Sequence, residues 1–242
     1  AASGEPGGFT HIPPQTEWCI RPEAAYCHIT TNETANGVQF PETPKLDGVP
    51  LVADMTSDFL TRPVDVSSYG LLYASAQKNV GPSGLTIVIL REELGGHAHA
   101  LTPSVFDYSL QMRNDSRYNT PPTFSIYMAG LVFQWIEEEG GLAAMERASE
   151  AKSSKLYGLI DGSDFYCCPV APEARSRVNV CFKLADETLD DVFDKEALEH
   201  GLINLRGHPV LGGFRASLYN AMSEHGVDVL VEFMADFESR HG

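Results

Sequence analysis

The sequence is short of positive charge, of paired cysteines and of long apolar runs. Lysine and arginine number 17 against 33 aspartates and glutamates, which gives a formal net charge of −16 over 242 residues. Nucleic acids and anionic membrane surfaces both attract a basic face, so this balance argues against either as a partner. It leaves room for an anionic small molecule in a local basic pocket. No apolar run reaches the roughly 18 residues that a membrane-spanning helix needs.

Cysteine and histidine are too sparsely arranged to predict a disulfide framework or a metal centre. The five cysteines are odd in number, scattered, and contain no C-x-x-C pair. This pattern favours reduced thiols, and with no signal peptide apparent we expect a cytoplasmic protein. His97 and His99 alternate as a metal pair would on a strand, but Gly95 and Gly96 indicate a flexible loop there, so we expect no metal.

What the sequence does contain is a series of short apolar runs, which predict buried strands at residues 24–30, 49–53, 69–74 and 85–90. Only the turn of residues 77–84 separates the last two runs. Because a parallel crossover needs a dozen or more residues, we expect those two strands to be antiparallel and the sheet to be mixed. Thr34, Asp54 and Lys78 then lie near the carboxyl ends of strands, where ligand sites in such sheets gather.

The second half of the chain changes in pattern. Apolar residues such as Phe124, Tyr127 and Leu131 recur at helical spacing and predict a buried-face helix over 121–139, with Asn119 and Thr120 as caps. After Gly140 and Gly141 we expect helices at 142–161, 189–199 and 227–240, and strands at 178–184, 202–206 and 214–219. This predicts an α/β chain of two domains, residues 1–140 and a smaller α+β domain of residues 141–242.

Asp54 and Lys78 form the most informative pair. They stand 78 − 54 = 24 residues apart, each at the end of a predicted strand. A pyridoxal phosphate site needs such a lysine for a Schiff base and such a carboxylate to hold the pyridinium nitrogen. Taken alone, the pair is more readily explained by a solvated lysine beside a glycine turn, because most lysines are exposed.

The chain resembles the phosphoserine aminotransferases, pyridoxal phosphate enzymes of the aspartate aminotransferase fold (fold type I). The resemblance rests on segments that run in family order: NET at 32–34, ADMTS at 53–57, TRPVD at 61–65, AQKNVGPSGLT at 76–86, YNTPPT at 118–123, ARSRVNV at 174–180, GGFRASLYNAM at 212–222 and RHG at 240–242. It implies a mixed, mostly parallel sheet in a partial large domain, followed by the small C-terminal domain. The family's N-terminal third has no counterpart, so we expect a partial chain of a longer protein.

The resemblance also implies a role for each matching residue. Lys78 is the catalytic lysine and moves the proton between substrate and cofactor. The implied cofactor-binding residues are Thr34, Asp54, Gln77, Lys78, Asn119 and Thr120, the last two reaching the neighbouring subunit of a homodimer. Arg215 is implied to clamp the substrate α-carboxylate, and His208 to lie near the substrate phosphate.

The implied reaction is amino transfer between glutamate and 3-phosphohydroxypyruvate in serine biosynthesis, with a further use in bacterial pyridoxine synthesis. Pro209 departs from the family, since it stands where an arginine is expected to grip the substrate phosphate, and Arg206 is a candidate to compensate. Two alternatives therefore stay open: an aminotransferase for another substrate, and a catalytically silent fragment or paralogue that dimerises or binds a ligand.

Overall fold

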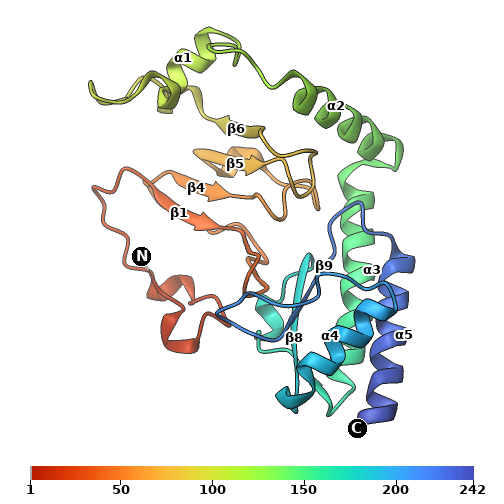
Figure 1. Ribbon diagram of the computed structural model, residues 1–242. Helices are drawn as coiled ribbons and strands as arrows, with labels where there is room; N and C mark the ends of the chain where they lie inside the picture. The colour runs from red at the N-terminus through yellow and green to blue at the C-terminus, as the bar shows by residue number, and fades with distance from the viewer. Residues whose placement is uncertain (1) are drawn as a thin grey trace.

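The computed structural model describes residues 2–242, and a four-stranded sheet forms one end of the molecule (Figure 1). Its strands are β1 Cys27–Thr30, β4 Leu51–Asp54, β5 Leu71–Ser75 and β6 Thr86–Leu90, in the order β1-β4-β5-β6. β1, β4 and β5 are parallel, and β6 pairs antiparallel with β5. The predicted mixed sheet and the antiparallel last pair are confirmed, because the short turn between β5 and β6 reverses the chain.

The two faces of this sheet differ in burial. Side chains that alternate along the strands pack on one face against partly buried aromatic and aliphatic residues: Cys27, Ile29, Leu51, Ala53, Leu72 and Ala74 are buried. On the other face His28 is exposed, and Asp54 and Tyr73 are partly exposed. Thr30, Asp54 and Tyr73 are cross-strand neighbours on that open face. Polar side chains at the strand ends thus remain accessible.

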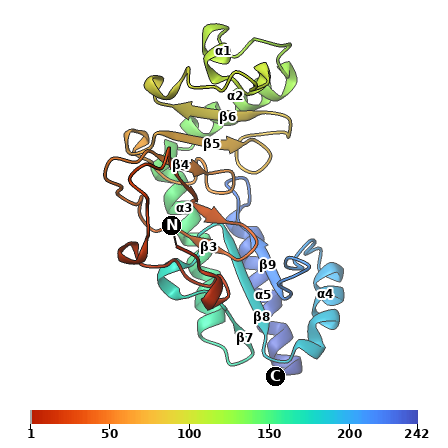
Figure 2. The ribbon, with the colours of Figure 1, turned by 90° about the vertical axis from the view of Figure 1, so that its left-hand side faces the viewer.

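A small hairpin links the sheet to the C-terminal half. Its strands are β2 Asn32–Glu33 and β3 Val38–Gln39, a pairing that we did not predict. Asn32 is buried and its amide nitrogen donates to Ser57 Oγ and to Asn179 Oδ1, both at 2.8 Å. Figure 2 shows β3 between the four-stranded sheet and β8. These bonds fix the hairpin that carries Thr34.

Two helices lead away from the sheet. α1 Tyr108–Arg113, which we did not predict, precedes α2 Thr123–Glu138. α2 starts later than expected, with Pro122 at its N-cap and no side-chain cap bond, so Asn119 and Thr120 do not cap it. The two prolines at 121 and 122 explain the shift, because a proline disfavours helical backbone in the residue before it.

The buried face of α2 is also different from the one the sequence predicted. Its buried residues are Ser125, Ala129 and Ile136, whereas Phe124 and Tyr127 are 69% and 63% exposed. Small side chains face the turn after β5, where Ala129 packs with Val80. Phe124, Ile126, Tyr127, Leu131 and Phe133 are exposed instead.

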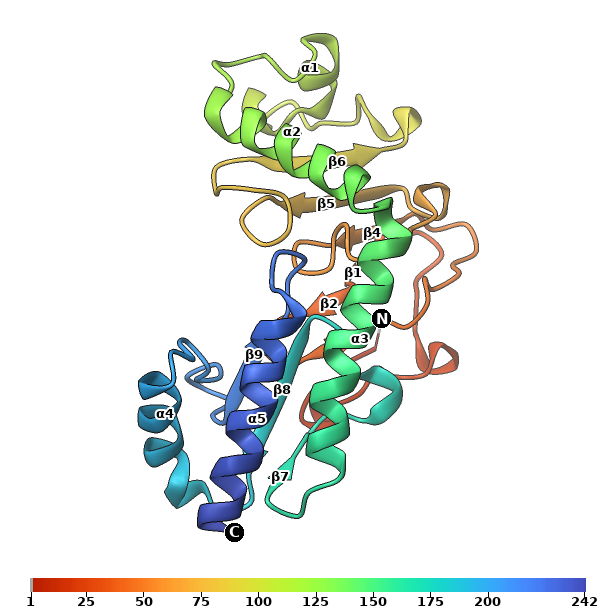
Figure 3. The ribbon, with the colours of Figure 1, turned by 90° about the vertical axis from the view of Figure 1, so that its right-hand side faces the viewer.

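The C-terminal half is built on the predicted helix–sheet pattern (Figures 1 and 3). Its elements are α3 Gly141–Asp161, β7 Tyr166–Cys167, β8 Asn179–Leu184, α4 Asp190–Glu199, β9 Phe214–Ser217 and α5 Glu224–His241. The strands form an antiparallel sheet in the order β7-β8-β9, and α3 runs beside α5 in Figure 3. β7 was not predicted.

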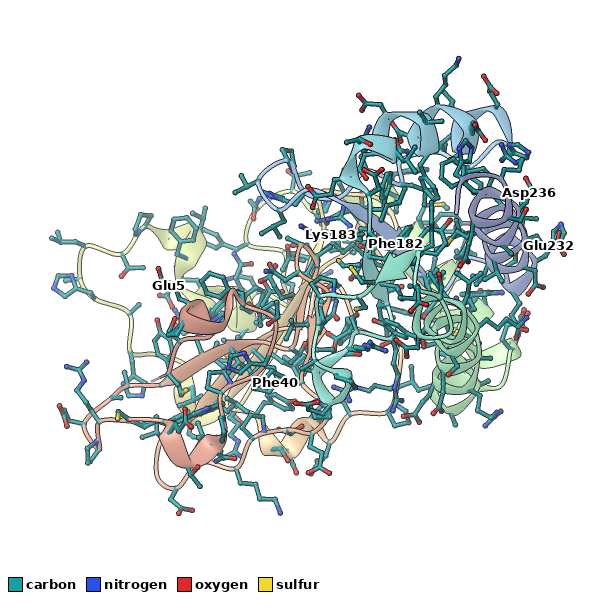
Figure 4. All side chains as sticks on the ribbon, turned by 90° about the horizontal axis from the view of Figure 1, so that it is seen from below. Glu5, Phe40, Phe182, Lys183, Glu232 and Asp236 are labelled. Carbon is teal, nitrogen blue, oxygen red and sulfur yellow. The ribbon has the colours of Figure 1, made fainter. Side chains whose placement is uncertain are left out.

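An aromatic cluster forms the core of this half. The rings of Phe193 and Phe214 lie 4.5 Å apart between centroids, and those of Phe193 and Phe237 lie 5.0 Å apart. Phe182 is also buried there, while Glu232 and Asp236 project from the outer side of α5 (Figure 4). Buried aromatic rings contribute both apolar area and favourable edge-to-face contacts.

The predicted strand at 202–206 is wrong. Only an isolated bridge joins Arg206 to Phe214, because Asn204 takes a left-handed backbone with φ of 60° that an extended strand excludes. The described residues also form short 3-10 turns at Glu5–Gly7, Gln15–Glu17, Val66–Ser68, Glu92–Leu94, Ser104–Phe106, Pro172–Ala174 and Glu187–Leu189.

Within residues 2–242 no helix is long and apolar enough to cross a bilayer. The same part of the chain holds no group of three or more histidine, cysteine or acidic side chains placed to bind a metal ion. All five cysteines are free thiols.

Candidate active site

The site forms where three strands end and the chain turns. Asp54 is the last residue of β4, Lys78 lies in the turn that follows β5, and Thr34 lies in the hairpin after β1. The Lys78 amine donates to Thr34 Oγ1 at 2.5 Å. The structure therefore brings together three residues that the sequence spreads over 78 − 34 = 44 positions.

The turn that carries Lys78 is held by its own backbone. The N–H groups of Val80 and Gly81 both donate to Ala76 O, at 3.0 and 2.8 Å. Gly81 has a φ of 159°, and a Cβ there would lie 3.5 Å from the backbone nitrogen of Ala129 in α2. The close approach of α2 fixes one side of the turn, so the backbone of Lys78 has little freedom.

Burial and neighbouring charges together set the pKa of Lys78. Burial lowers the pKa of its ammonium below the ordinary lysine value, and this is the largest cause. Asp54 opposes that shift, whereas the Arg215 guanidinium adds to it by repulsion. The net lowering matters because an unprotonated amine is the nucleophilic form.

The Asp54 carboxylate is oriented by the chain that follows it. Its Oδ1 accepts the Thr56 N–H at 2.8 Å. The Tyr73 hydroxyl lies beside this carboxylate: burial raises the pKa of Tyr73, and Asp54 raises it further. His28 Nε2 contacts the same hydroxyl at 3.1 Å. We did not single out Tyr73 or His28, although the strand register that pairs Tyr73 with Asp54 was the signal that could have identified Tyr73.

Arg215 approaches the site from the C-terminal half. It lies on β9 opposite Cys181 of β8 and is partly buried. Its Nε is buried without a hydrogen-bond partner among the described residues. A buried guanidinium nitrogen without a partner is costly unless an anion binds there. An amine of lowered pKa, a carboxylate, a hydroxyl and this open guanidinium thus fit an amine-reactive cofactor together with an anionic substrate.

Four other predicted residues make no side-chain hydrogen bond to this cluster within the described chain. Gln77 is exposed beside Lys78, and His208 is exposed in the loop after β-bridge residue Arg206, where its Nδ1 accepts the Val210 N–H at 3.3 Å. Asn119 and Thr120 are exposed just before α2, and no hydrogen bond within the described chain joins their side chains to the cluster. Their roles stay predictions.

Arg206 does not replace the missing basic residue at position 209. Its guanidinium contacts the carboxylates of Asp190 at 3.7 Å and Asp194 at 3.2 Å, and also pairs with Asp191. It further lies over the Phe214 ring, 5.3 Å from the centroid. A guanidinium held by three carboxylates on α4 has little capacity left for a substrate phosphate, which argues against the compensating role of Arg206.

Comparisons with known proteins agree on one family. The family model described as aminotransferase class-V matches residues 6–230. The phosphoserine aminotransferase of Laribacter hongkongensis (strain HLHK9) is 56% identical over 243 aligned positions, which cover all of this chain and 67% of the relative.

Solved structures give the same result. The phosphoserine aminotransferase from Bacillus circulans subsp. alkalophilus superposes with a TM-score of 0.98 at 44% identity, over 100% of this chain and 67% of that one. A phosphoserine aminotransferase from Trichomonas vaginalis with bound pyridoxal phosphate gives a TM-score of 0.89 at 39% identity, over 93% and 64%. The chain therefore spans about two thirds of the length of these relatives.

Proposed function

The chain belongs to the phosphoserine aminotransferases of the class-V aminotransferase family, and from this premise we propose that it catalyses amino transfer between glutamate and 3-phosphohydroxypyruvate. The products are 2-oxoglutarate and phosphoserine, a step of serine biosynthesis. The observation that carries the proposal is the clustering of three groups: the Lys78 amine, which donates to Thr34 Oγ1 at 2.5 Å, the nearby Asp54 carboxylate, and the Arg215 guanidinium, whose buried Nε has no hydrogen-bond partner among the described residues.

The proposed cofactor is pyridoxal phosphate, which supplies an aldehyde that condenses with an amine and a ring that accepts the electron pair released at the substrate Cα. Lys78 would provide the amine and Asp54 the carboxylate that faces the ring nitrogen. Thr34 and Gln77 would border the ring. The relative with bound pyridoxal phosphate supports this choice.

The chain's own residues account for proton and substrate handling. With its pKa lowered by burial, Lys78 can take the proton from the substrate Cα and return it. Arg215 would clamp the substrate α-carboxylate, since its buried Nε is left free for an acceptor. His208 would approach the far end of the substrate.

We also propose a cytoplasmic homodimer in which Asn119 and Thr120 bind the cofactor phosphate of the neighbouring site. Both residues are exposed, and the apolar side chains of Phe124 and Tyr127 beside them are exposed as well. The free thiols of all five cysteines suit a reducing compartment. We extend the proposal to pyridoxine biosynthesis, which the resemblance implies for bacteria.

The division of the chain is proposed to follow residue 140, where α2 ends and α3 begins. Residues 1–140 would then contribute the cofactor site and residues 141–242 the small domain. α3 supports this division because it packs against α5 and β8.

In a second candidate function, the same amino transfer uses an unphosphorylated keto acid as the acceptor. It is favoured by Pro209 in place of a basic residue and by the engagement of Arg206 with three carboxylates. Losing one charge-assisted phosphate contact costs roughly 1.5–3 kcal/mol, or about tenfold or more in affinity.

Steady-state assays of the complete protein with glutamate would separate the two candidates. The proposal expects a higher kcat/KM with 3-phosphohydroxypyruvate than with hydroxypyruvate. A preference for hydroxypyruvate would favour the second candidate, and no turnover with either would contradict both and leave the catalytically silent alternative.

A further inference from the structure

A buried lysine outside the site already described holds a turn of the C-terminal half. Lys152, in the middle of α3, is 2% exposed. Its ammonium donates to three backbone carbonyls, Leu218 O at 3.2 Å, Tyr219 O at 2.9 Å and Met222 O at 2.9 Å. An ammonium has three protons, so every donor is matched by one acceptor of the 218–222 turn.

No carboxylate forms an ion pair with Lys152 among the described residues. Burial lowers the pKa of its ammonium, and only the more distant Glu224 opposes this. Burying a lysine without a counter-ion is costly. An uncharged residue at this position of α3 would avoid that cost. What the ammonium provides instead is three hydrogen bonds to the 218–222 turn.

The 218–222 turn directly continues β9, the strand that carries Arg215. At its centre, the Asn220 N–H donates to Asn79 Oδ1 at 3.0 Å, and the Asn220 amide nitrogen donates to Leu60 O at 2.9 Å. Leu60 has a left-handed backbone with φ of 65°, a conformation that costs free energy for a leucine. Asn220 therefore stabilises the strained backbone at Leu60.

Asn79 is the residue next to Lys78 and is 6% exposed. Its amide nitrogen donates to Ser57 O at 3.1 Å, in the segment that follows Asp54. Asn79 thus joins the turn carrying the reactive amine to the segment after the carboxylate, and Asn220 joins both to the strand carrying the guanidinium.

We propose that Lys152 is a positioning residue that holds the amine of Lys78 in place through the turn of residues 218–222. Lys152 orders the turn, Asn220 within it holds Asn79, and the peptide of Lys78 is fixed as a result. The relay also sets the separation of Lys78 from Arg215. The inference rests on the proposed function only for the task of Lys78.

Burial and nearby charged groups set the protonation of Lys78. The charged groups are Asp54, Glu33 and Asp58, which favour the ammonium, and Arg215, which disfavours it together with burial. If the 218–222 turn loosens, water reaches the amine and Arg215 moves relative to it. Both changes favour the ammonium, so the lysine titrates at higher pH.

The test is competitive labelling of the complete, cofactor-free protein with trace acetic anhydride over a pH series, with each lysine quantified by peptide mass spectrometry. Lys152→Met is the main variant. Lys155→Met is the matched control, because Lys155 lies one turn along α3 and reaches α5 through Asp228 at 2.7 Å and Glu224 at 3.4 Å without touching the 218–222 carbonyls.

We expect Lys152→Met to move the labelling midpoint of Lys78 to higher pH, with about threefold less unprotonated amine at a fixed pH below the midpoint. Lys155→Met should leave that midpoint unchanged. A general loss of stability would lower the melting temperature without moving the midpoint of the folded protein. An unchanged midpoint in folded Lys152→Met would overturn the proposal.

Asn79→Ala tests the last link of the relay and leaves the contacts of Lys152 intact. It should move the Lys78 midpoint in the same direction, and the double variant with Lys152→Met should move it no further than Asn79→Ala alone. Additive shifts would contradict the relay. If Lys152→Met does not fold, an unchanged midpoint in Asn79→Ala is sufficient to contradict it.

Because the labelling uses no cofactor, its outcome is separate from that of the proposed function. A shifted midpoint in a protein that fails to take pyridoxal phosphate on Lys78 would keep the relay and remove the aminotransferase proposal. If the protein takes the cofactor on Lys78 but the variants show no shift of the midpoint, the aminotransferase proposal stands and the relay is contradicted.

Discussion

At the level of single residues, the amine of Lys78 stands between two charges of opposite sign. Asp54 favours its ammonium form, while burial and Arg215 favour the neutral amine, and burial is the largest influence. Either charge alone would move the pKa in one direction. With Asp54 and Arg215 both present, the pKa of Lys78 stays lowered while a carboxylate remains close to the amine.

Arg215→Gln tests whether the Arg215 guanidinium binds the substrate α-carboxylate. We expect KM for glutamate to rise about tenfold to a hundredfold, because roughly 1.5–3 kcal/mol of charge-assisted hydrogen bonding to the α-carboxylate is lost. Steady-state kinetics of the complete protein would measure it. Arg177→Gln is the control, since Arg177 is exposed and pairs with Glu146 at 3.5 Å. Equal KM values for both variants would remove Arg215 from substrate binding.

The convergence of Thr34, Asp54 and Lys78 was predictable because each follows a strand of one sheet, and strand ends meet at one edge. The engagement of Arg206 was not, since the sequence does not show which face of α4 presents its aspartates. The bond between Asn79 and Asn220 spans 141 residues, and no local pattern relates two such positions. Residues placed by the end of a strand could therefore be predicted from the sequence. Side-chain pairs between distant elements could not.

At the scale of elements, Asp58 holds the hairpin of β2 and β3. It is 4% exposed, accepts from Thr31 Oγ1 at 2.5 Å and from Gln39 Nε2 at 3.1 Å, and lies 3.8 Å from an Arg62 nitrogen. Burial raises the pKa of Asp58 above its ordinary value despite these bonds. The hairpin that carries Thr34 is thus fixed by a carboxylate that is costly to ionise.

Asp58→Asn tests this with a defined sign. A carboxyl whose pKa is raised in the folded state stabilises fully below its unfolded pKa, and this contribution is lost as pH rises through the folded pKa. The free energy of unfolding of the native protein, minus that of Asp58→Asn, should therefore fall as pH rises from about 4. Denaturant titrations over a pH series would measure the difference.

Asp186→Asn is the control for that series. The Asp186 carboxylate is exposed and accepts from Thr188, which lowers its pKa. The free energy of unfolding of the native protein, minus that of Asp186→Asn, should instead fall as pH is lowered. The ionised Asp186 carboxylate stabilises the fold at neutral pH, and this stabilisation is lost when the carboxylate is protonated. A pH-independent difference for Asp58→Asn would contradict the assigned burial cost.

The prediction for α2 shows why a helix's period is easier to read than its buried face. Apolar residues surround much of this helix, and helical spacing alone selected the face with Phe124, Tyr127 and Leu131. The side buried in the structure carries Ser125, Ala129 and Ile136, and Ala129 packs against the turn that contains Val80 and Gly81. Packing against a particular turn decides the face, and the sequence pattern does not contain that partner.

At the scale of the whole molecule, exposed apolar side chains gather on one part of the chain. The exposed large apolar residues of segments 101–118 and α2 are Leu101, Val105, Phe106, Tyr108, Met112, Tyr118, Phe124, Ile126, Tyr127, Leu131 and Phe133. Exposed apolar side chains concentrated in one part of the chain fit the interface of the proposed homodimer. It lies beside Asn119 and Thr120, which the proposed homodimer brings to the neighbouring site.

The double variant Phe124→Asp, Tyr127→Asp tests the dimer. Sedimentation velocity of the complete protein should show a dimer for the native chain and a shift toward monomer for the variant, since two buried charges at an interface are costly. Leu198→Asp is the control, because Leu198 on α4 is also 61% exposed but lies away from this surface. A variant that dimerises as the native chain does would contradict the assigned surface.

The claim on which the account depends is that Lys78 carries pyridoxal phosphate. The direct measurement is titration of the complete protein with pyridoxal phosphate, borohydride reduction and mass mapping of the labelled peptides, with Lys78→Ala in parallel. We expect one cofactor mass on Lys78 and none in the variant. Label spread over many lysines, or label unchanged in Lys78→Ala, would contradict it.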